Sequence, residues 1–386
     1  YGWSDEDKRG NNERTSRKLE TFERFGFDVG TIICFFYLYA FGTKNSKTQM
    51  KAVGFKTSLP ISEEESFIEF ETAKPQPSGH ELLVKISAVS VNPVDFKIRQ
   101  NSAKGTELDT PKVIGWDATG VVEAVGEKVS LFQVGDKVYY AGDITKPGSN
   151  SEYQLIDERI VGKQPSTLSD EAAAAMPLTV LTAWEIFFDR MRLSAERDQN
   201  KTLLIIGGAG GVGSIAIQMA KKLLGLKVIA TASRPETIEW CQKMGADLVV
   251  NHRNLVEDVR GAGVQFVDFI VDFVDTNGYW DAMAELIKPQ GHIASITGSA
   301  VPVALNKLKS KSVSFSWEFM YTRSTYQTDD IIEQHHILNR VAQLLDEGIL
   351  FTTHTHTLHG LSAKTLKQAH AQLESGTTIG KWVIKY

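Results

Sequence analysis

The residues with the clearest chemical meaning form a glycine cluster in the middle of the chain. The pattern G-x-G-x-x-G is formed by Gly208, Gly210 and Gly213, and it encloses Gly211 and Val212. Four aliphatic residues precede the cluster and helical spacing follows it, so the glycines stand at a predicted strand-to-helix junction. There the first glycine allows a tight turn, the second lets a pyrophosphate approach the backbone, and the third lets the helix pack closely on the strand. Together with the unpaired N–H groups at the helix N-terminus, the pattern predicts a dinucleotide site.

The loop after the next predicted strand bears on the choice of nicotinamide cofactor. NAD-binding sheets place a carboxylate about 20 residues beyond the glycine pattern, where it accepts a hydrogen bond from the ribose 2′-OH. This sequence has Ser233 and Arg234 there, and we expect no carboxylate to compete with them. A guanidinium beside a hydroxyl suits a 2′-phosphate dianion, so the sequence predicts NADP(H). An exposed arginine in a loop is the alternative.

The elements that must position these residues alternate between strand and helix beyond residue 201. Such alternation predicts a parallel sheet covered by helices on both faces. We predict strands over 202–207, 227–232, 248–252, 267–274 and 292–297, and helices over 211–224, 235–244 and 279–287. A further helix over 330–347 and a closing strand over 381–386 follow.

The chain before this region has a different character. From residue 50 to about 160, short strands are punctuated by glycine and proline, as in a compact, barrel-like β domain. The predicted strands include 81–89 and 118–125, and a turn at 135–136 leads into another strand. A helical stretch over 172–188 then joins the two regions.

The composition narrows the class of protein. The 386 residues are 42% hydrophobic and 23% charged, with a formal net charge of -5 and two cysteines. This composition is typical of a soluble enzyme, and the chain is long enough for two domains with sizeable cores. No dense block of lysine and arginine is present, which argues against nucleic-acid binding and against anionic membranes. Two distant cysteines predict no disulfide framework, so we expect a reducing, cytoplasmic location.

Residues 1–49 differ from the rest of the chain. A polar stretch of mixed charge is followed by an apolar segment over 29–42, which is shorter than the roughly 20 residues that span a membrane. The mixed charge is unlike the start of a signal peptide. The chain begins with Tyr1, whereas Met50 begins a stretch typical of an enzyme start. We therefore expect an extension that is not part of the fold, with a membrane-anchoring segment as the alternative.

Three motifs in the β-rich region complete a family pattern. They are VNPVD at 91–95, GWDATGVV at 115–122 and GDKV at 135–138. With the glycine pattern, they make residues 50–386 resemble the medium-chain dehydrogenase/reductase superfamily, in its quinone oxidoreductase and alkenal reductase branch. Some members of this branch are named "zinc-type alcohol dehydrogenase-like".

The resemblance implies a specific α/β architecture. It comprises a GroES-like β-barrel catalytic domain over 50–173, completed by 320–386, and a Rossmann domain over 174–319, with a cofactor cleft between them. The family often forms homodimers by pairing the edge strands of its Rossmann sheets.

Further cofactor contacts follow only from the resemblance. Thr182 matches a family threonine near the nicotinamide. His252 stands where related reductases have an aromatic residue that contacts the 2′-phosphate. Lys381 stands where the C-terminal strand directs a basic residue toward the pyrophosphate, and an exposed strand lysine is the alternative.

The family's zinc ligands do not match this sequence. Asn92 and Trp116 occupy the positions of a cysteine and a histidine ligand, and the structural four-cysteine lobe is missing. Asparagine and tryptophan are not zinc ligands in proteins. His354, His356 and His359 form a histidine-rich stretch, which we interpret as a polar loop. The sequence therefore predicts no metal site.

Without a Lewis acid to ionise an alcohol, we expect reduction of a quinone, an enone or an enal, with NADPH as hydride donor. The acceptor oxygen then needs hydrogen-bond donors. The family's cleft motifs offer Asn92, Lys97 and Tyr140, although core packing is an equal alternative for Tyr140. We expect Asp95 to cap a helix over 96–99.

Two other function classes stay open at this point. A zinc alcohol dehydrogenase is disfavoured by the missing ligands. A non-enzymatic, ζ-crystallin-like protein that binds NADPH and RNA shares the fold, and it is disfavoured by the acidic net charge.

Overall fold

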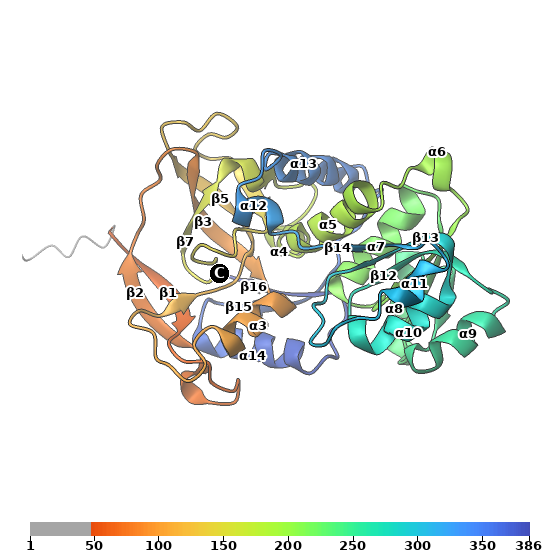
Figure 1. The fold of residues 1–386 in the computed structure, drawn as a ribbon. Helices are drawn as coiled ribbons and strands as arrows, with labels where there is room; N and C mark the ends of the chain where they lie inside the picture. The colour runs from red at the N-terminus through yellow and green to blue at the C-terminus, as the bar shows by residue number, and fades with distance from the viewer. Residues whose placement is uncertain (1–47) are drawn as a thin grey trace, which may run out of the picture. The chain divides into compact units, whose positions relative to one another are not determined.

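The computed structural model describes residues 48–386, and Met50–Tyr386 form one compact unit. The apolar segment 29–42 and nearly all of the predicted extension lie outside the described residues. Within the compact unit, a β-rich part contains both ends of the described chain, and a parallel sheet with its helices is formed by the middle of the chain (Figure 1).

The parallel sheet has six strands in the order β11-β10-β9-β12-β13-β14. Numbered along the chain, this is the order 3-2-1-4-5-6 of doubly wound dinucleotide-binding sheets. The predicted parallel sheet is confirmed. Its strands are β9 (Thr202–Ile206), β10 (Lys227–Thr231), β11 (Leu248–Val250), β12 (Val267–Asp272), β13 (Ile287–Ser295) and β14 (Ser314–Trp317).

Helices cover both faces of this sheet because its central strand is apolar on both sides. Leu203 and Ile205 pack into a core with helix α7, whereas Leu204 and Ile206 pack into a separate core with α9 and α10. Side chains alternate between the two faces of a strand, so four consecutive aliphatic residues supply both cores. The helices are α7 (Gly211–Lys222), α8 (Pro235–Met244), α9 (Leu255–Gly261), α10 (Thr276–Leu286) and α11 (Asn306–Lys309).

The β-rich part consists of two sheets. A three-stranded sheet has the order β2-β1-β4, and a seven-stranded sheet has the order β15-β16-β3-β5-β6-β8, with β7 also paired to β3. The C-terminal strand β16 runs antiparallel to β3, so the end of the chain completes the sheet begun near its start. The strands of the two sheets together are β1 (Gln49–Phe55), β2 (Ile68–Ala73), β3 (Glu81–Ser90), β4 (Lys112–Val113), β5 (Asp117–Val125), β6 (Lys137–Tyr140), β7 (Tyr153–Asp157), β8 (Val161–Lys163), β15 (His354–His359) and β16 (Lys381–Lys385).

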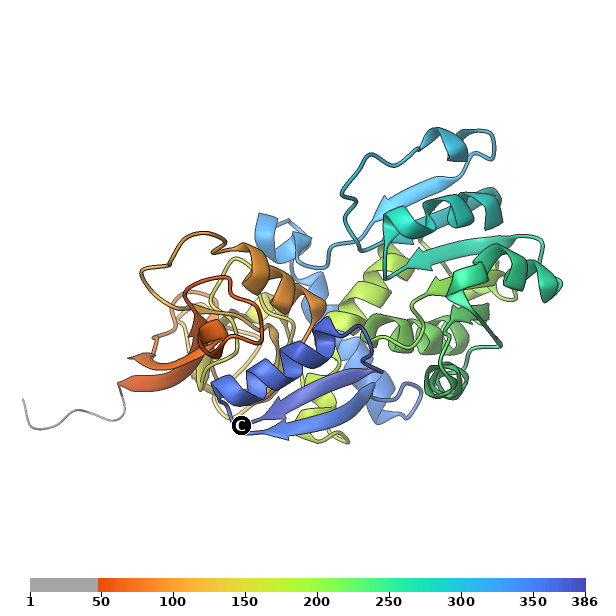
Figure 2. The same cartoon turned by 90° about the horizontal axis from the view of Figure 1, so that it is seen from below.

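Several helices pack against these sheets. Helix α14 lies along β15 and β16, as the second view shows (Figure 2). The helices of this part are α3 (Pro93–Asn101), α4 (Asp170–Ala174), α12 (Thr322–Tyr326), α13 (Glu333–Asp346) and α14 (Ala363–Glu374).

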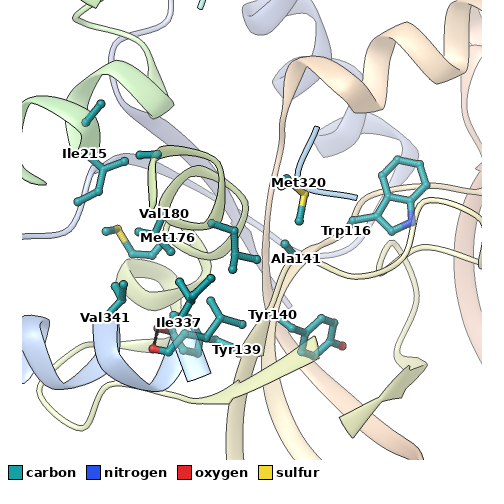
Figure 3. Close-up of a cluster of buried hydrophobic side chains, with 14 of the residues drawn as sticks. Trp116, Tyr139, Tyr140, Ala141, Met176, Val180, Ile215, Met320, Ile337 and Val341 are labelled. Atoms are coloured by element: carbon teal, nitrogen blue, oxygen red, sulfur yellow. Dashed lines mark hydrogen bonds between the residues drawn. The ribbon is translucent and has the colours of Figure 1, made fainter. Parts of the chain in front are cut away.

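A central helix joins the two parts of the unit. Helix α5 (Pro177–Trp184) continues into a π-helical turn, Glu185–Arg190. Met176, which precedes α5, and Val180 within it belong to a buried cluster with Ile215 of α7 and Val341 of α13 (Figure 3). The run Asp170–Arg190 is long and apolar enough to cross a membrane, but 78% of its most apolar window is buried inside the protein. In the described part of the chain this run, which contains α4, α5 and the π-helical turn, belongs to the core.

Candidate active site

The glycine cluster links β9 to α7 through a turn that side chains would block. A Cβ atom on Gly213 would lie 2.1 Å from the Gly207 carbonyl oxygen, and one on Gly208 would lie 2.8 Å from the Ala230 Cβ. Gly210 precedes α7, and the nearest atom to a Cβ there would be 3.6 Å away, an ordinary contact. Packing within the protein therefore requires glycine at 208 and 213, whereas glycine at 210 leaves space over the helix N-terminus for a phosphate group.

Arg234 lies between β10 and α8, as the sequence predicted, but it is not free. Its Nη2 donates to the Thr377 carbonyl oxygen at 2.9 Å, and its Nε lies 3.2 Å from a Glu236 carboxylate oxygen. The side chain is 36% exposed, and the neighbouring Ser233 is exposed. The expectation that no carboxylate competes is corrected: Glu236, in the first turn of α8, lies on the helical face next to the guanidinium.

His252 follows β11 in the next loop of the same sheet edge. Its Nδ1 lies 3.2 Å from the Tyr279 hydroxyl, and the side chain is half-buried. The glycine cluster, Arg234 and His252 thus follow the carboxyl ends of three adjacent strands, β9, β10 and β11. Ligands of open parallel sheets bind at this edge.

A buried polar network lies beside the glycine cluster. The Lys381 ammonium donates to the Asp117 carboxylate at 3.1 Å, to the Val91 carbonyl oxygen at 2.9 Å, and to the Asn92 side-chain oxygen. Asp117 also accepts from the Asn92 amide at 2.8 Å and from the Leu178 backbone N–H at 2.7 Å. The start of α3, the start of β5, helix α5 and the start of β16 therefore meet at one carboxylate.

This network joins the β-rich part to the cofactor edge. The Lys381 side-chain stem lies against Gly211, where a Cβ would come within 2.7 Å of the Lys381 Cδ. The Gly380 N–H donates to the Ala209 carbonyl oxygen at 2.9 Å. Lys381 is 4% exposed, so the alternative of an exposed strand lysine is wrong. Its ammonium is bound within the network beside the glycine cluster, and its role toward a pyrophosphate stays a prediction.

Asp95 caps its helix as expected, but from inside the first turn and not as the N-cap residue. Helix α3 begins at Pro93, and proline is a favoured residue at the first position of a helix. Asn92 is the N-cap residue. The Asn92 backbone N–H donates to the Asp95 carboxylate at 2.7 Å, so Asp95 completes a capping box from inside the helix. The predicted helix over 96–99 therefore starts too late. Burial raises the Asp95 pKa to about 7, opposed by the hydrogen bond from Asn92 and by the charge of Lys381.

The predicted donors do not converge on one point. Lys97 is exposed on α3. Tyr140 is buried, and its hydroxyl donates to the Gln154 side-chain oxygen at 3.0 Å, as the core-packing alternative describes (Figure 3). Thr182 is buried on α5 and donates to the Leu178 carbonyl oxygen at 2.7 Å. Of the three predicted substrate donors, only Asn92 belongs to the buried network, and its amide already donates to Asp117.

Two features of the site escape sequence reasoning. The Lys381–Asp117 pair joins residues 264 positions apart, and no spacing rule connects them. Tyr321, between β14 and α12, is buried with its ring 6.2 Å from that of Trp116. Aromatic residues near 317–321 were the only signal, and such a run is equally typical of a core.

Comparison with known proteins identifies the family. Residues 78–166 match the alcohol dehydrogenase GroES-like domain, and residues 211–333 match the zinc-binding dehydrogenase domain. A zinc-type alcohol dehydrogenase-like protein from Staphylococcus epidermidis is 48% identical over 87% of this chain and 99% of its own length. The chain belongs to the medium-chain dehydrogenase/reductase superfamily. It is thus in an oxidoreductase family, with a GroES-like domain and a Rossmann-type domain.

Other members of the superfamily show the same fold or related activities. A candidate zinc-dependent alcohol dehydrogenase from Rhizobium etli CFN 42 is 47% identical, with a TM-score of 0.82 over 88% of this chain and 98% of its own. The Escherichia coli quinone oxidoreductase, solved with NADPH, is 25% identical, with a TM-score of 0.74 over 87% of this chain and 100% of its own. A 2-methylene-furan-3-one reductase from Solanum lycopersicum is 35% identical over 61% of this chain and 59% of its own length.

The superfamily's zinc position does not fit a metal in this chain. Asn92 and Trp116 supply no thiolate or imidazole, and the Lys381 ammonium contacts both Asn92 and Asp117. A cation held at that carboxylate repels a second cation, and tetrahedral zinc needs Cys, His or carboxylate ligands. Across residues 48–386, no group of three or more His, Cys, Asp or Glu side chains could hold a metal ion. His354, His356 and His359 lie on strand β15, so the interpretation of this stretch as a loop is wrong. His354 is hydrogen bonded to Thr357 at 2.8 Å, and the His356 ring lies 4.1 Å from that of Trp382.

Proposed function

We propose that the protein is an NADPH-dependent reductase that transfers hydride to quinones or to activated alkenes, such as enones and enals, without zinc. The observation that carries the proposal is the buried network of Lys381, Asp117 and Asn92. It places an internal ammonium at the superfamily's zinc position, beside the glycine cluster. Oxidising an alcohol requires a group that ionises it, and Lewis-acid metals do so. Reducing an electron-poor acceptor requires only hydrogen-bond donors for the developing oxyanion.

The residues around the sheet edge fit NADPH. When bound, NADPH supplies a hydride from C4 of its nicotinamide. The N-terminus of α7 and the space over Gly210 would hold the pyrophosphate, while Arg234 and Ser233 would bind the 2′-phosphate from β10. His252 would lie beyond them, and Thr182 on α5 would border the nicotinamide. The quinone oxidoreductase solved with NADPH supports this cofactor.

The acceptor class is supported by relatives as well as by chemistry. One similar protein is named a quinone oxidoreductase, and another is named a reductase of a methylene-furanone, which is an activated alkene. In both acceptor types, charge arriving with a hydride moves to an oxygen atom. A buried site with fixed donors stabilises that charge without a metal.

Steady-state turnover tests the proposal. NADPH oxidation is followed by absorbance with a quinone, an enone, an enal and a simple ketone, and NADP⁺ reduction is followed with the matching alcohols. We expect turnover with the quinone, the enone or the enal and little with the ketone or the alcohols. Turnover confined to alcohols would contradict the proposal, and turnover with NADH equal to that with NADPH would contradict its cofactor.

We also propose that two copies associate through β14. This strand is at the edge of the parallel sheet, with Trp317 47% exposed at its end and Phe319 exposed just beyond it. An edge strand presents unpaired N–H and C=O groups, and a second copy of the same strand can pair with them.

A further inference from the structure

The proposed reduction needs a donor for the acceptor oxygen, and the predicted donors are used elsewhere. Both the Tyr140 hydroxyl and the Asn92 amide donate to other side chains. Lys97 is exposed. Among residues 48–386, the buried donors without a partner include Trp116 Nε1, next to Asp117 in the chain, and the Tyr321 hydroxyl, whose pKa is raised by the carboxyls of Asp95 and Asp117. Buried polar atoms in proteins almost always have a partner, so an unpartnered buried donor is a candidate for binding a ligand.

The Tyr321 hydroxyl differs from those of the protein's other well-packed tyrosines. Tyr139 donates to the Leu338 carbonyl oxygen at 2.6 Å, Tyr140 to Gln154 at 3.0 Å, and Tyr386 to the Ser149 carbonyl oxygen at 2.7 Å. Tyr321 is 2% exposed, yet within the described part of the chain its hydroxyl has no partner. Three of these hydroxyls are thus hydrogen bonded within the fold, whereas the fourth has no partner among residues 48–386.

The surroundings of Tyr321 hold the ring in place. Its ring packs edge-on against Trp116, with the two planes at 71°, and lies 5.5 Å from the Phe319 ring. The Thr325 N–H donates to the Tyr321 carbonyl oxygen at 2.8 Å, and the Ser324 hydroxyl donates to it at 3.1 Å. Trp116 and Met320, the residue before Tyr321, lie at one end of the buried cluster (Figure 3). A ring fixed in this way can direct its hydroxyl without reorganisation.

Burial, together with the carboxyls that face it, keeps the Tyr321 hydroxyl protonated. Burial raises the Tyr321 pKa well above its usual value, and the carboxyls of Asp95, Asp117 and Asp143 raise it further. A neutral phenol remains a hydrogen-bond donor at any physiological pH. Lys381 balances the charge of Asp117, so an oxyanion near Tyr321 does not face an unopposed carboxylate there.

We propose that Tyr321 donates the hydrogen bond that stabilises the acceptor oxygen of the substrate while hydride arrives at carbon. This inference rests on the proposed reductase function. A new C–H bond forms at the electron-poor carbon, the displaced π electron pair moves to the oxygen, and NADPH becomes NADP⁺. Tyr321 keeps its O–H bond throughout. For an enone or enal, water then protonates the α carbon of the enolate to give the saturated carbonyl compound. For a quinone, water protonates the oxygen, and a ring C–H proton is exchanged through water for an O–H proton to give the hydroquinone.

The variant Tyr321→Phe tests the proposal because it removes only the hydroxyl. We expect kcat/KM with an enone or quinone to fall by about 10²-fold, which is typical for loss of one oxyanion donor. The NADPH Kd should not change. Thermal stability should be equal to or above that of the wild type, since the deleted hydroxyl has no partner among residues 48–386. Tyr140→Phe is the matched buried control, and it should lose stability because its hydroxyl is bonded. Tyr326 is 75% exposed on α12, so Tyr326→Phe should change neither kcat/KM nor thermal stability.

A second measurement separates failure of the inference from failure of the proposed function. Binding of 4-nitrophenol to the NADP⁺-loaded protein, read from the change in its absorbance, probes the donor without turnover. We expect Tyr321→Phe to bind it at least tenfold more weakly than the wild type. If the wild type reduces enones and Tyr321→Phe matches it within about twofold, the inference is overturned while the function stands. If the wild type reduces no acceptor, the function fails, and equal or undetectable 4-nitrophenol binding by both proteins then overturns the inference as well.

Discussion

Replacing Lys381 by methionine should expose how strongly the buried network depends on its ammonium. The substitution removes the cationic partner that Asp117 has among residues 48–386 and keeps most of the side-chain volume. Asp117 would retain the Asn92 amide at 2.8 Å and the Leu178 N–H at 2.7 Å. Breaking a buried ion pair costs about 3–5 kcal/mol, and the two remaining donors place this case near 3 kcal/mol. At about 2–4 °C per kcal/mol for domains of this size, the melting temperature should fall by roughly 6–12 °C.

The pH dependence of that loss identifies its cause. Burial raises the Asp117 pKa, and Lys381 opposes the rise, so removing Lys381 raises this pKa further. A carboxyl whose pKa is higher in the folded than in the unfolded protein binds more protons when folded. Folding is then weakened as pH rises from the unfolded pKa through the folded one. The melting-temperature difference between Lys381→Met and wild type should therefore be smaller at about pH 5 than at about pH 8.

Differential scanning fluorimetry of three proteins at both pH values makes this measurement. The third protein carries Lys381→Met together with Asp117→Asn, which removes the isolated charge. It should recover most of the lost stability and show little pH dependence. A Lys381→Met protein as stable as the wild type, or a double variant less stable than the single one, would refute the reasoning.

Four further outcomes are expected. Arg234→Ala should raise the NADPH Kd by about tenfold and leave the NADH Kd unchanged. This factor is at the low end for loss of a hydrogen bond to a charged group, because the Arg234 side chain is one-third exposed and paired with Glu236. Glu236→Gln should tighten NADPH binding, and fluorescence titrations in which either variant matches the wild type would contradict this. Gly213→Ala should destabilise the fold, since its Cβ would lie 2.1 Å from the Gly207 carbonyl oxygen. Gly210→Ala should melt like the wild type and only weaken NADPH binding. Equal melting temperatures for the two variants would contradict this reasoning. Trp317→Lys should convert a dimer to monomers by light scattering, with Tyr326→Lys as an exposed control away from β14, and an unchanged mass would exclude β14 as the interface.

Local sequence signals predicted the elements that carry the cofactor edge. Helix α8 was predicted at its observed bounds, because Pro235 suits the first helical position and Gly245, at a φ of 111°, ends it. Strand β12 ends two residues before its prediction, at Asp272, although the apolar run continues to Val274, which is exposed. Strand β13 begins five residues before its prediction, at Ile287. Apolar runs indicate that a strand exists, but hydrogen-bond partners decide where it ends.

The chemistry of the site depends on contacts that no local pattern describes. Arg234 was found from its distance to the glycine cluster, but its pairing with Glu236 depends on how α8 begins. The sequence identified Asn92 as a candidate donor to the substrate. In the fold, Asp117 and Lys381 come from distant strands and form hydrogen bonds with both ends of the Asn92 amide. Tyr140 and Tyr321 are both buried aromatic residues, and the sequence does not distinguish their hydroxyls. Only the three-dimensional structure shows that the first hydroxyl is bonded.

The central claim, a reductase that works without zinc, is tested most directly by turnover of metal-free protein. The protein is dialysed against a strong chelator, elemental analysis verifies that zinc is below stoichiometric amounts, and NADPH oxidation is measured with the acceptor that the wild type prefers. The proposed function predicts the same kcat before and after chelation, and no increase when zinc is added back. Activity that disappears with the metal and returns with one equivalent of zinc per chain would contradict it.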